Sequence, residues 1–218
     1  MNDIYEFLTG PGVWAAFIIF IGGLVVRLVY LLALSKERDR VLYNHASFGW
    51  ALRSIFHWLV PLGSVGWRTQ PLFATAFFVF HLCLLGVPLF LLAHNTLWQE
   101  AFGVSLPSLP DSVADVGTVV LLVAALVLLA RRIVRPEVRI LSTAWDYFLL
   151  ILTCAPFVTG FLAYHQVGPY KLMMILHVFL AEILLIVIPF SKLAHIVLFF
   201  FSRTSIAFEM GRREARTW

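Results

Sequence analysis

Histidines are the residues of this 218-residue chain that are best suited to chemistry. Two of the seven, His45 and His57, fall in a polar connection, whereas the other five fall in or at the ends of apolar segments. An ionisable side chain at membrane depth is costly, so each of these five is a candidate functional residue. They are His81, His94, His165, His177 and His195.

The apolar segments that must position these histidines are long enough to span a membrane. Hydrophobic residues make up 61% of the chain and charged residues 13%, against roughly 45–50% and about 25% in soluble domains. A spanning helix needs about 20 mostly apolar residues. We therefore expect an all-α integral membrane protein, a five-helix transmembrane bundle forming a single domain over 1–218, with helices at approximately 13–34, 71–94, 113–130, 144–164 and 171–202.

The distribution of basic residues predicts the orientation of these helices. Lysines and arginines gather after the first and third helices and in the tail. On the other side the first residues carry Asp3 and Glu6, the 95–112 loop has no lysine or arginine, and Lys171 stands alone. The positive-inside rule then places the N-terminus in the periplasm and the C-terminus in the cytoplasm of a bacterial inner membrane. A basic balance spread in this way is a topology signal, and no nucleic-acid partner is expected. The basic residues on the expected inner side are Lys36, Arg38, Arg40, Arg53, Arg68, Arg131, Arg132, Arg135, Arg139, Arg203, Arg212, Arg213 and Arg216.

The first inner connection contains apolar residues at helical spacing over approximately 46–60. This pattern predicts an amphipathic helix lying on the inner membrane surface. Two interpretations stay open for it. The helix is either a simple interfacial anchor in membrane lipid or a docking ledge for a cytoplasmic partner.

Histidines of the second and fifth helices match in depth. These helices cross in opposite directions, so His81 and His195 lie toward the inner side, and His94 and His177 toward the outer side. The 18 residues from His177 to His195 make about five turns of a continuous helix, ~27 Å along its axis. Facing imidazoles at one depth are what a bis-imidazole haem b needs. We predict two haem b groups, with His81 and His195 as axial ligands of the inner iron and His94 and His177 as those of the outer.

The spacing on the second helix does not suit a straight helix. His81 and His94 are 13 residues apart, which turns an ideal helix through about 220°. Pro88 lies between them and could kink or rephase the helix. The alternative outer ligand is His165, at the outer end of the fourth helix.

Cofactors other than non-covalent haem find little support in the sequence. Cys83 and Cys154 both lie in apolar runs, and no CxxC, CxxCH or Cys/His cluster is present. A zinc site, an iron–sulfur site and covalent haem c are therefore not expected within this chain.

Further polar residues are candidates for supporting roles. Arg27 and Lys192 could each neutralise a haem propionate or extend to the inner interface. A quinone site needs hydrogen-bond donors and a base near a haem, and the junction of helices four and five supplies Tyr164, His165, Tyr170 and Lys171. The other interpretation of that junction is a polar turn with interfacial aromatic residues.

Taken together, the paired histidines on helices two and five, the Phe80–His81 pair and the 18-residue interval on helix five resemble the cytochrome b (gamma) subunit of respiratory nitrate reductase. The resemblance covers nearly the whole chain. One departure concerns the second histidine of helix two, which that family usually places ten residues after the first. Leu91 stands at that position here, and His94 follows three residues later.

The short tail and the amphipathic first connection look more like shorter relatives of that subunit in sulfate-reducing bacteria, from the transmembrane redox complexes called Hmc, Tmc and Dsr. What the resemblance implies is a set of partners: other membrane subunits, a periplasmic multihaem cytochrome c and a cytoplasmic iron–sulfur protein. Menaquinone is the quinone that such a site would take.

The function expected from the sequence is that of a haem b subunit carrying electrons between a quinone pool or periplasmic cytochrome and a cytoplasmic iron–sulfur partner. Bond chemistry would then reside in other subunits of the oxidoreductase complex, apart from a quinol/quinone site. A haem-free membrane anchor or scaffold is the first alternative. A small transporter or channel is the second, and it predicts a polar-lined route through the bundle.

Overall fold

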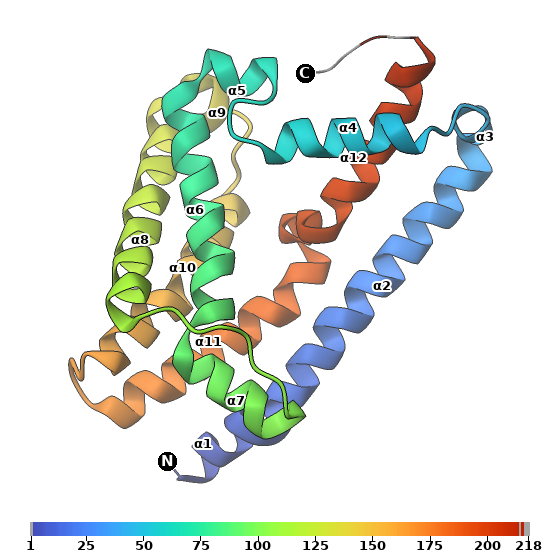
Figure 1. Cartoon of the computed structure of the whole chain (residues 1–218). Coiled ribbons are helices and arrows are strands. Elements are labelled where there is room, and N and C mark those ends of the chain that lie inside the picture. The colour runs from blue at the N-terminus through green and yellow to red at the C-terminus, as the bar shows by residue number, and fades with distance from the viewer. Residues whose placement is uncertain (1, 214, 216–218) are drawn as a thin grey trace. The chain divides into compact units, whose positions relative to one another are not determined.

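The structure is a computed structural model that describes residues 2–213 and residue 215 (Figure 1). Helices are the only regular elements among these residues, so the predicted all-α class is confirmed. A helix satisfies its backbone hydrogen bonds within its own segment, as a membrane span must. Arg216, one of the basic tail residues, lies outside the described part.

Six helices in the described part are long enough and apolar enough to cross a membrane. In the most apolar 18-residue stretch of each helix, at most 28% of the residues are buried inside the protein. Their apolar surface therefore faces outward, where lipid or partner chains can cover it. The six are Asn2–Arg38, Pro71–Phe90 (α6), Asp111–Val134 (α8), Ala144–Tyr164 (α10), Tyr170–Phe190 and Lys192–Gly211.

The expected count of five differs from this because the predicted long helix over 171–202 is interrupted. It consists of α11 (Tyr170–Val187), the 3₁₀ turns η2 (Ile188–Phe190) and η3 (Lys192–Ala194), and α12 (His195–Arg212). Ser191 separates the two turns with an extended backbone, φ −124° and ψ −174°. Pro189 has no N–H to continue the helix, so a continuous ladder of hydrogen bonds is lost here. His177 and His195 are therefore not separated by five turns of one continuous helix, as the sequence predicted.

The chain divides into two compact units, which are described here one at a time. One unit is Leu72–Met174, and the other joins the residues up to Pro71 with those from Ile175 onward.

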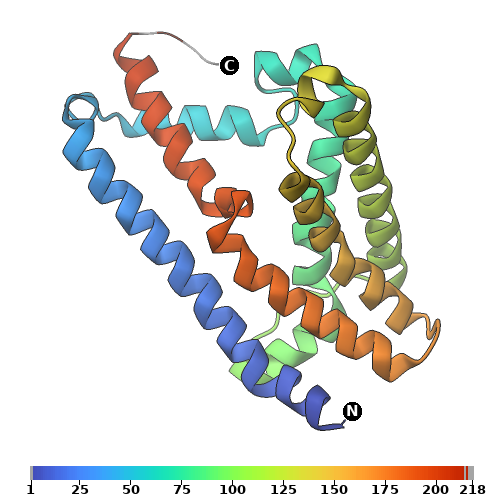
Figure 2. The ribbon, with the colours of Figure 1, turned by 180° about the vertical axis from the view of Figure 1, so that it is seen from behind.

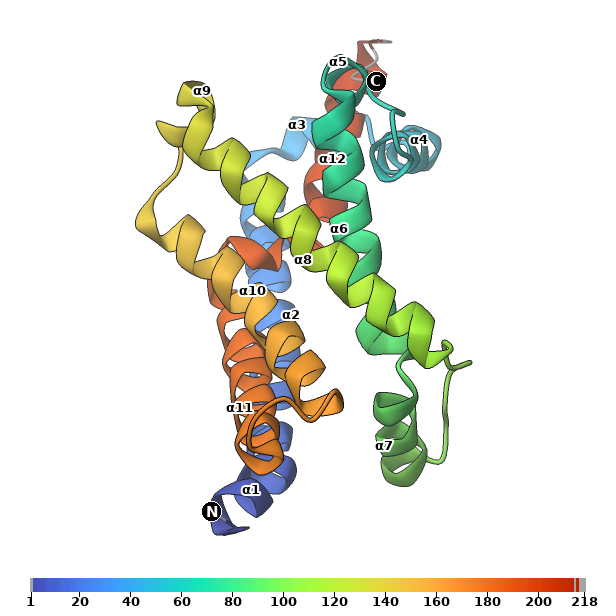
Figure 3. The same ribbon diagram turned by 90° about the vertical axis from the view of Figure 1, so that its left-hand side faces the viewer.

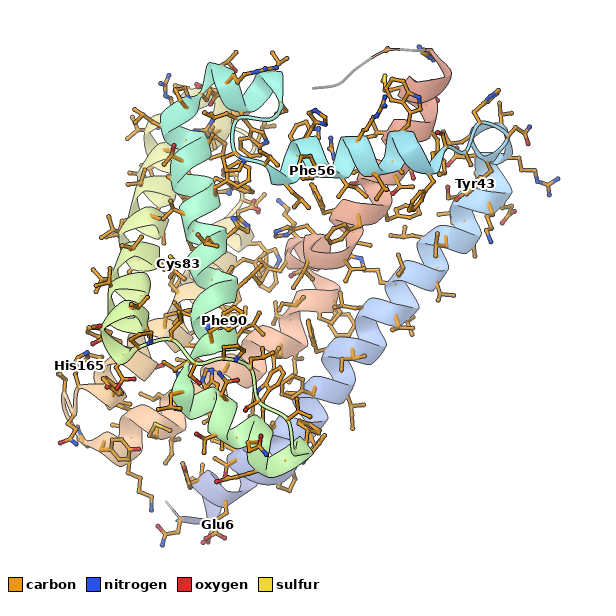
Figure 4. The ribbon with its side chains drawn as sticks, viewed as in Figure 1. Glu6, Tyr43, Phe56, Cys83, Phe90 and His165 are labelled. Carbon is orange, nitrogen blue, oxygen red and sulfur yellow. The ribbon has the colours of Figure 1, made fainter. Side chains whose placement is uncertain are left out.

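In the Leu72–Met174 unit, α8 runs antiparallel to α10. Arg132 near the end of α8 lies 4.0 Å from Asp146 near the start of α10. At the other end, Asp115 of α8 meets His165, which directly follows α10. The core where α6 meets these helices contains Phe80, Leu121, Ala124 and Ala125. The half-buried Cys154 and Cys83 pack against it, and Figure 4 labels Cys83 on α6.

The second predicted helix, 71–94, is also broken. Helix α6 ends at Phe90, Leu91 is extended, and a separate helix α7 covers Leu92–Phe102 (Figure 3). The break comes three residues after Pro88, whose missing N–H and ring disrupt the last turns. The freed carbonyl of Phe90 accepts a hydrogen bond from the Leu109 N–H at 2.8 Å. The connection after α7 therefore folds back onto the end of α6.

In the other unit, one long helix is accompanied along its length by the interrupted segment. The long helix comprises α1 (Asn2–Phe7), the π-helical turn η1 (Leu8–Gly12) and α2 (Val13–Arg38). Gly12 lies against Glu182 and Gly23 against Pro189, so residue numbers rise together along both partners. Close to the far end, Tyr43 meets the Phe208 ring. The later part of α11 and α12 consequently run in the same direction, parallel to α2 (Figure 2).

The amphipathic segment expected over 46–60 contains the helix α4, Phe48–Leu59. The Ser47 side chain caps its start by accepting from the Trp50 N–H at 3.5 Å. The helix lies across α12, where Trp50 packs so closely on Gly211 that a Cβ there would come within 2.7 Å of the indole (Figure 1). Phe48 and Phe56 remain exposed on α4. The shorter helices are α3 (Arg40–Tyr43), α5 (Val65–Thr69) and α9 (Pro136–Arg139).

Candidate functional site

His81 is held in the middle of α6 by its own helix. Its Nδ1 lies 2.8 Å from the carbonyl oxygen of Phe77, one turn earlier. The imidazole also stacks obliquely on the Phe77 ring at 4.1 Å and meets the Phe80 ring edge-on at 5.3 Å. Because Phe80 belongs to the core of its unit, the position of the His81 ring is fixed on one side by packed aromatic residues.

His94 lies in the first turn of α7, just beyond the break. Its Nδ1 is 2.9 Å from the carbonyl oxygen of Pro88, six residues back in α6. A continuous helix would not bring these two groups together, since its turns repeat every 3.6 residues. The break at Leu91 thus creates the contact that holds the His94 ring.

His165 occupies a different environment at the end of α10. Its Nε2 lies 3.1 Å from Oδ2 of Asp115, which lies near the start of α8. The ring also stacks obliquely on Phe161 at 4.3 Å. Figure 4 shows His165 at this end of the helix pair. Here a carboxylate engages Nε2, whereas at His81 and His94 a main-chain carbonyl engages Nδ1.

The two remaining histidines stand on either side of the interrupted segment. His177 is half-buried in α11. His195 is the first residue of α12, and its Nδ1 lies 2.9 Å from the carbonyl oxygen of Lys192 in the preceding 3₁₀ turn. The contact with the Lys192 carbonyl therefore ties the orientation of the His195 ring to the short turn η3.

Arg27 fixes the interruption from the neighbouring helix. Its Nη1 donates hydrogen bonds to the carbonyl oxygens of Pro189 at 2.7 Å and Ser191 at 3.0 Å. The ladder of helical hydrogen bonds stops here, although the Ser191 carbonyl also accepts from the Ala194 N–H at 3.3 Å. The guanidinium thus supplies the Pro189 carbonyl with a donor in place of a helical N–H. Lys192, the other residue proposed to pair with a propionate, is exposed at the start of η3.

Ser191 links Arg27 to η3, the turn that precedes His195. While its carbonyl accepts from Arg27, its hydroxyl accepts from the Leu193 N–H at 3.1 Å and so caps η3. The Lys192 carbonyl of that capped turn then faces His195. A chain of three hydrogen-bonded steps therefore connects Arg27 with the His195 ring.

The residues proposed for a quinone site meet two aspartates that the sequence analysis assigned no part in it. Tyr164 forms a side-chain hydrogen bond with Asp111, and His165 pairs with Asp115. Tyr164 and His165 are exposed and lie next to each other, with rings 5.2 Å apart. Tyr170 is exposed and Lys171 half-buried in the first turn of α11. The structure therefore adds two acceptors to this cluster of donors.

One buried carboxylate, Glu182 in α11, was missed by sequence reasoning. It is 7% exposed, and its Oε1 has no hydrogen-bond partner in the described part of the protein. The signal was present in the sequence, since Glu182 is the one carboxylate in an apolar run from 172 to 190.

Comparison with known proteins places the chain in a family. No family model matches the chain, and no solved structure matches it. A curated protein of Nitratidesulfovibrio vulgaris (strain Hildenborough) is 47% identical over 210 residues, covering 94% of this chain and 93% of the relative. The fold makes the chain a multi-pass membrane protein, with six potential spanning helices in its described part. It belongs to the same family as this relative, whose name, given only as "Protein", specifies no activity.

Proposed function

We propose that the protein is a haem b subunit of a membrane redox complex that conducts electrons across the bilayer. The observation that carries this proposal is the way three imidazoles are held. His81, His94 and His195 each place Nδ1 within 2.9 Å of a main-chain carbonyl oxygen. Their partners in the proposal are a quinone or periplasmic multihaem cytochrome on one side and a cytoplasmic iron–sulfur protein on the other.

The chemistry of these donors fits haem iron. A carbonyl oxygen only accepts, so Nδ1 carries the hydrogen in each of the three rings. A neutral imidazole protonated at Nδ1 presents its lone pair at Nε2, the form in which histidine ligates metals. A carbonyl bonded to the other ring nitrogen also orients the ligand. Bound haem would supply a one-electron carrier, and this chain's residues would hold and orient it.

Depth separates these histidines from a similar one on α4. His57 has the same arrangement, with Nδ1 2.7 Å from the Arg53 carbonyl. It lies on the amphipathic helix, however, whereas His81 and His195 lie in helices apolar enough to span a membrane. A costly ionisable residue at that depth needs a function, and a residue on the interfacial helix does not. We therefore propose His81, His94, His177 and His195 as haem ligands; their assignment to an inner and an outer haem remains the prediction made from the sequence.

We also propose that the six long helices make five crossings. The later part of α11 and α12 follow a single helix, α2, in one direction (Figure 2). Two consecutive crossings would run in opposite directions, so these two segments suit one interrupted crossing. Together with the distribution of basic residues, this supports a periplasmic N-terminus and a cytoplasmic C-terminus.

The haem proposal is tested by the spectrum and haem content of the purified full-length chain. We expect a b-type α-band on reduction and two haems per chain by the pyridine haemochrome assay. His81→Ala and His195→Ala should each remove one haem's signal. His57→Ala is the matched control, since it deletes a ring held in the same way, and it should leave the haem content unchanged.

A colourless protein that is folded and inserted would overturn the proposal and favour the haem-free anchor. Loss of haem in His57→Ala to the same extent as in His81→Ala would also overturn the ligand assignment, because it would show that haem content follows general damage.

A further inference from the structure

Glu182 stands apart from the other buried carboxylate in the described part of the chain. Asp146 is 8% exposed and accepts from the Thr143 N–H and hydroxyl, both at 2.9 Å, near Arg132. Glu182 is 7% exposed, and the described part supplies neither an ion pair for it nor a donor for its Oε1. Asp146 thus has hydrogen-bond donors that stabilise a buried carboxylate, whereas Oε1 of Glu182 has none in the described part of the chain.

The surface facing Glu182 is the π-helical turn η1. A Cβ added to Gly12 would lie 2.7 Å from Oε1 of Glu182 and 3.2 Å from the carbonyl oxygen of Phe7. No titratable side chain of η1 is present to neutralise the carboxylate, since the turn reads Leu-Thr-Gly-Pro-Gly. Single π-helical turns inside α-helices occur frequently at functional sites. Gly12 therefore leaves space that a side chain would fill, and the carboxyl group occupies it.

An ionised carboxylate in this environment is costly. Moving a charge out of water without a compensating partner carries a large penalty, which the group avoids by becoming neutral. Carboxyl groups of this kind inside membrane helices commonly belong to proton relays. A proton on the Glu182 carboxyl removes the charge and needs no cation nearby.

We propose that Glu182 is a proton-binding site within the apolar part of the protein. The carboxylate takes up one proton, an O–H bond forms at a carboxyl oxygen, and the reverse step releases the proton; no electron changes hands. This function does not depend on haem, and it gives the chain a group able to move protons in addition to electrons.

The experiment is labelling of the full-length chain in native membranes with dicyclohexylcarbodiimide. A protonated carboxyl adds across one C=N bond of this apolar reagent, and the adduct rearranges to a stable N-acylurea without a leaving group. Peptide mass spectrometry should find the modification on Glu182 and not on Asp146. Glu182→Gln should abolish it. An unlabelled Glu182 in a chain that is otherwise intact, or equal labelling of Asp146, would overturn the proposal.

Two glycines of the same turn provide matched variants. Gly12→Ala places a methyl group against the carboxyl, whereas a Cβ at Gly10 meets nothing within 4 Å. Labelling should fall in Gly12→Ala and stay unchanged in Gly10→Ala. Equal labelling of the two variants would show that the η1 turn does not form the site.

Exchange of the proton is tested separately from its presence. The rate of labelling is measured over a range of bulk pH in the absence of quinone, and again with a short-chain hydroquinone added. Labelling that declines as pH rises shows release to water, and labelling that responds only to hydroquinone identifies that source. Labelling that responds to neither would show a permanently held proton and overturn the exchange step. Infrared loss of a protonated carboxyl band in Glu182→Gln, but not in Asp146→Asn, is the independent readout.

Discussion

At the scale of single residues, the position of one hydrogen decides what each imidazole can do. A main-chain carbonyl holds Nδ1 of His81, His94 and His195, which directs the lone pair to Nε2. At His165 the carboxylate of Asp115 lies 3.1 Å from Nε2 instead. His165 would have to leave Asp115 to ligate iron through that nitrogen, whereas His94 would not have to leave the Pro88 carbonyl.

This difference predicts which histidine is the outer ligand. His94→Ala should lower the haem content of the purified chain from two to one, because the imidazole itself is lost. His165→Ala should keep both haems and break the contact with Asp115. The pyridine haemochrome assay measures both. Loss of haem in His165→Ala with full retention in His94→Ala would reverse the assignment.

The depth of the candidate residues could be predicted from the sequence, but their immediate partners could not. The depth of a histidine follows from counting along an apolar run. The pairing of His165 with Asp115 joins residues 50 positions apart, and it depends on how α8 and α10 align. Glu182 stands out in the sequence as a lone carboxylate in an apolar run. Its contact with Gly12, however, depends on the π-helical turn η1, which the periodicity of apolar residues does not predict.

At the scale of elements, the interruption at Ser191 owes its shape to a neighbouring helix. Arg27 donates to the carbonyls of Pro189 and Ser191 at the break, and of these two only the Ser191 carbonyl also accepts from a main-chain N–H, that of Ala194. Hydrogen bonds to a charged donor contribute about 1.5–3 kcal/mol when a partner would otherwise stay buried and unsatisfied. Arg27 therefore acts as a structural clamp on the turn that precedes His195, in addition to the propionate role still proposed for it.

We predict that Arg27→Met lowers the free energy of unfolding by roughly 1.5–3 kcal/mol. Thermal unfolding in detergent measures the loss, and Arg40→Met, at an exposed position, is the control. Arg27→Lys should restore only part of the stability, since an ammonium lacks the fork of a guanidinium. If the clamp also positions His195, the reduction potential of one haem should shift in Arg27→Met; unchanged stability would contradict the clamp itself.

Two adjacent glycines of α2 allow a sharper test of the same contact. A Cβ at Gly23 would lie 2.7 Å from Cβ of Pro189, whereas a Cβ at Gly22 meets nothing within 4 Å. Gly23→Ala should therefore destabilise the protein by about 1–3 kcal/mol through overpacking. Gly22→Ala should leave stability unchanged or slightly raised, since alanine favours a helix more than glycine does. Similar unfolding temperatures for the two variants would contradict the close approach of α2 and η2.

The existence of the long helices could be predicted from length and apolar composition, whereas their interruptions could not. Pro88 was recognised as a source of a kink, but the break falls three residues later, where the returning connection supplies a new donor to Phe90. Pro189 lies at the second break, inside the segment that was expected to be one continuous helix over 171–202. In both cases a proline weakens the helix, and distant residues decide where it ends.

At the scale of the whole molecule, the count of crossings is the main consequence of these interruptions. Among the described residues, six helices satisfy the length and composition of a span. Five crossings leave the two ends of the chain on opposite sides of the membrane, and six would leave them on the same side. The hydropathy of the segments is the same in either topology, so sequence alone could not separate them once the break is known.

We predict the topology with single cysteines introduced into a chain whose Cys83 and Cys154 are replaced. In spheroplasts, a membrane-impermeant maleimide should label Glu6→Cys and leave Arg139→Cys and Arg213→Cys unlabelled until the membrane is permeabilised. Phe190→Cys, at the interruption, should resist labelling in both conditions because five crossings place it within the bilayer. Labelling of Arg213→Cys from outside would establish six crossings.

The extended backbone at Leu91 has a consequence for how such proteins change over evolutionary time. Within an unbroken helix, inserting one residue rotates everything beyond it by about 100°, so the intervals between side chains that share a helix face are kept rigidly. A joint between α6 and α7 absorbs an added or deleted residue locally, and the carbonyls it frees can recruit a nearby side chain, as Pro88 recruits His94. A search that demands a fixed interval between the two histidines would therefore pass over relatives in which the joint has moved, whereas a search built on the proline and the following histidine would retain them.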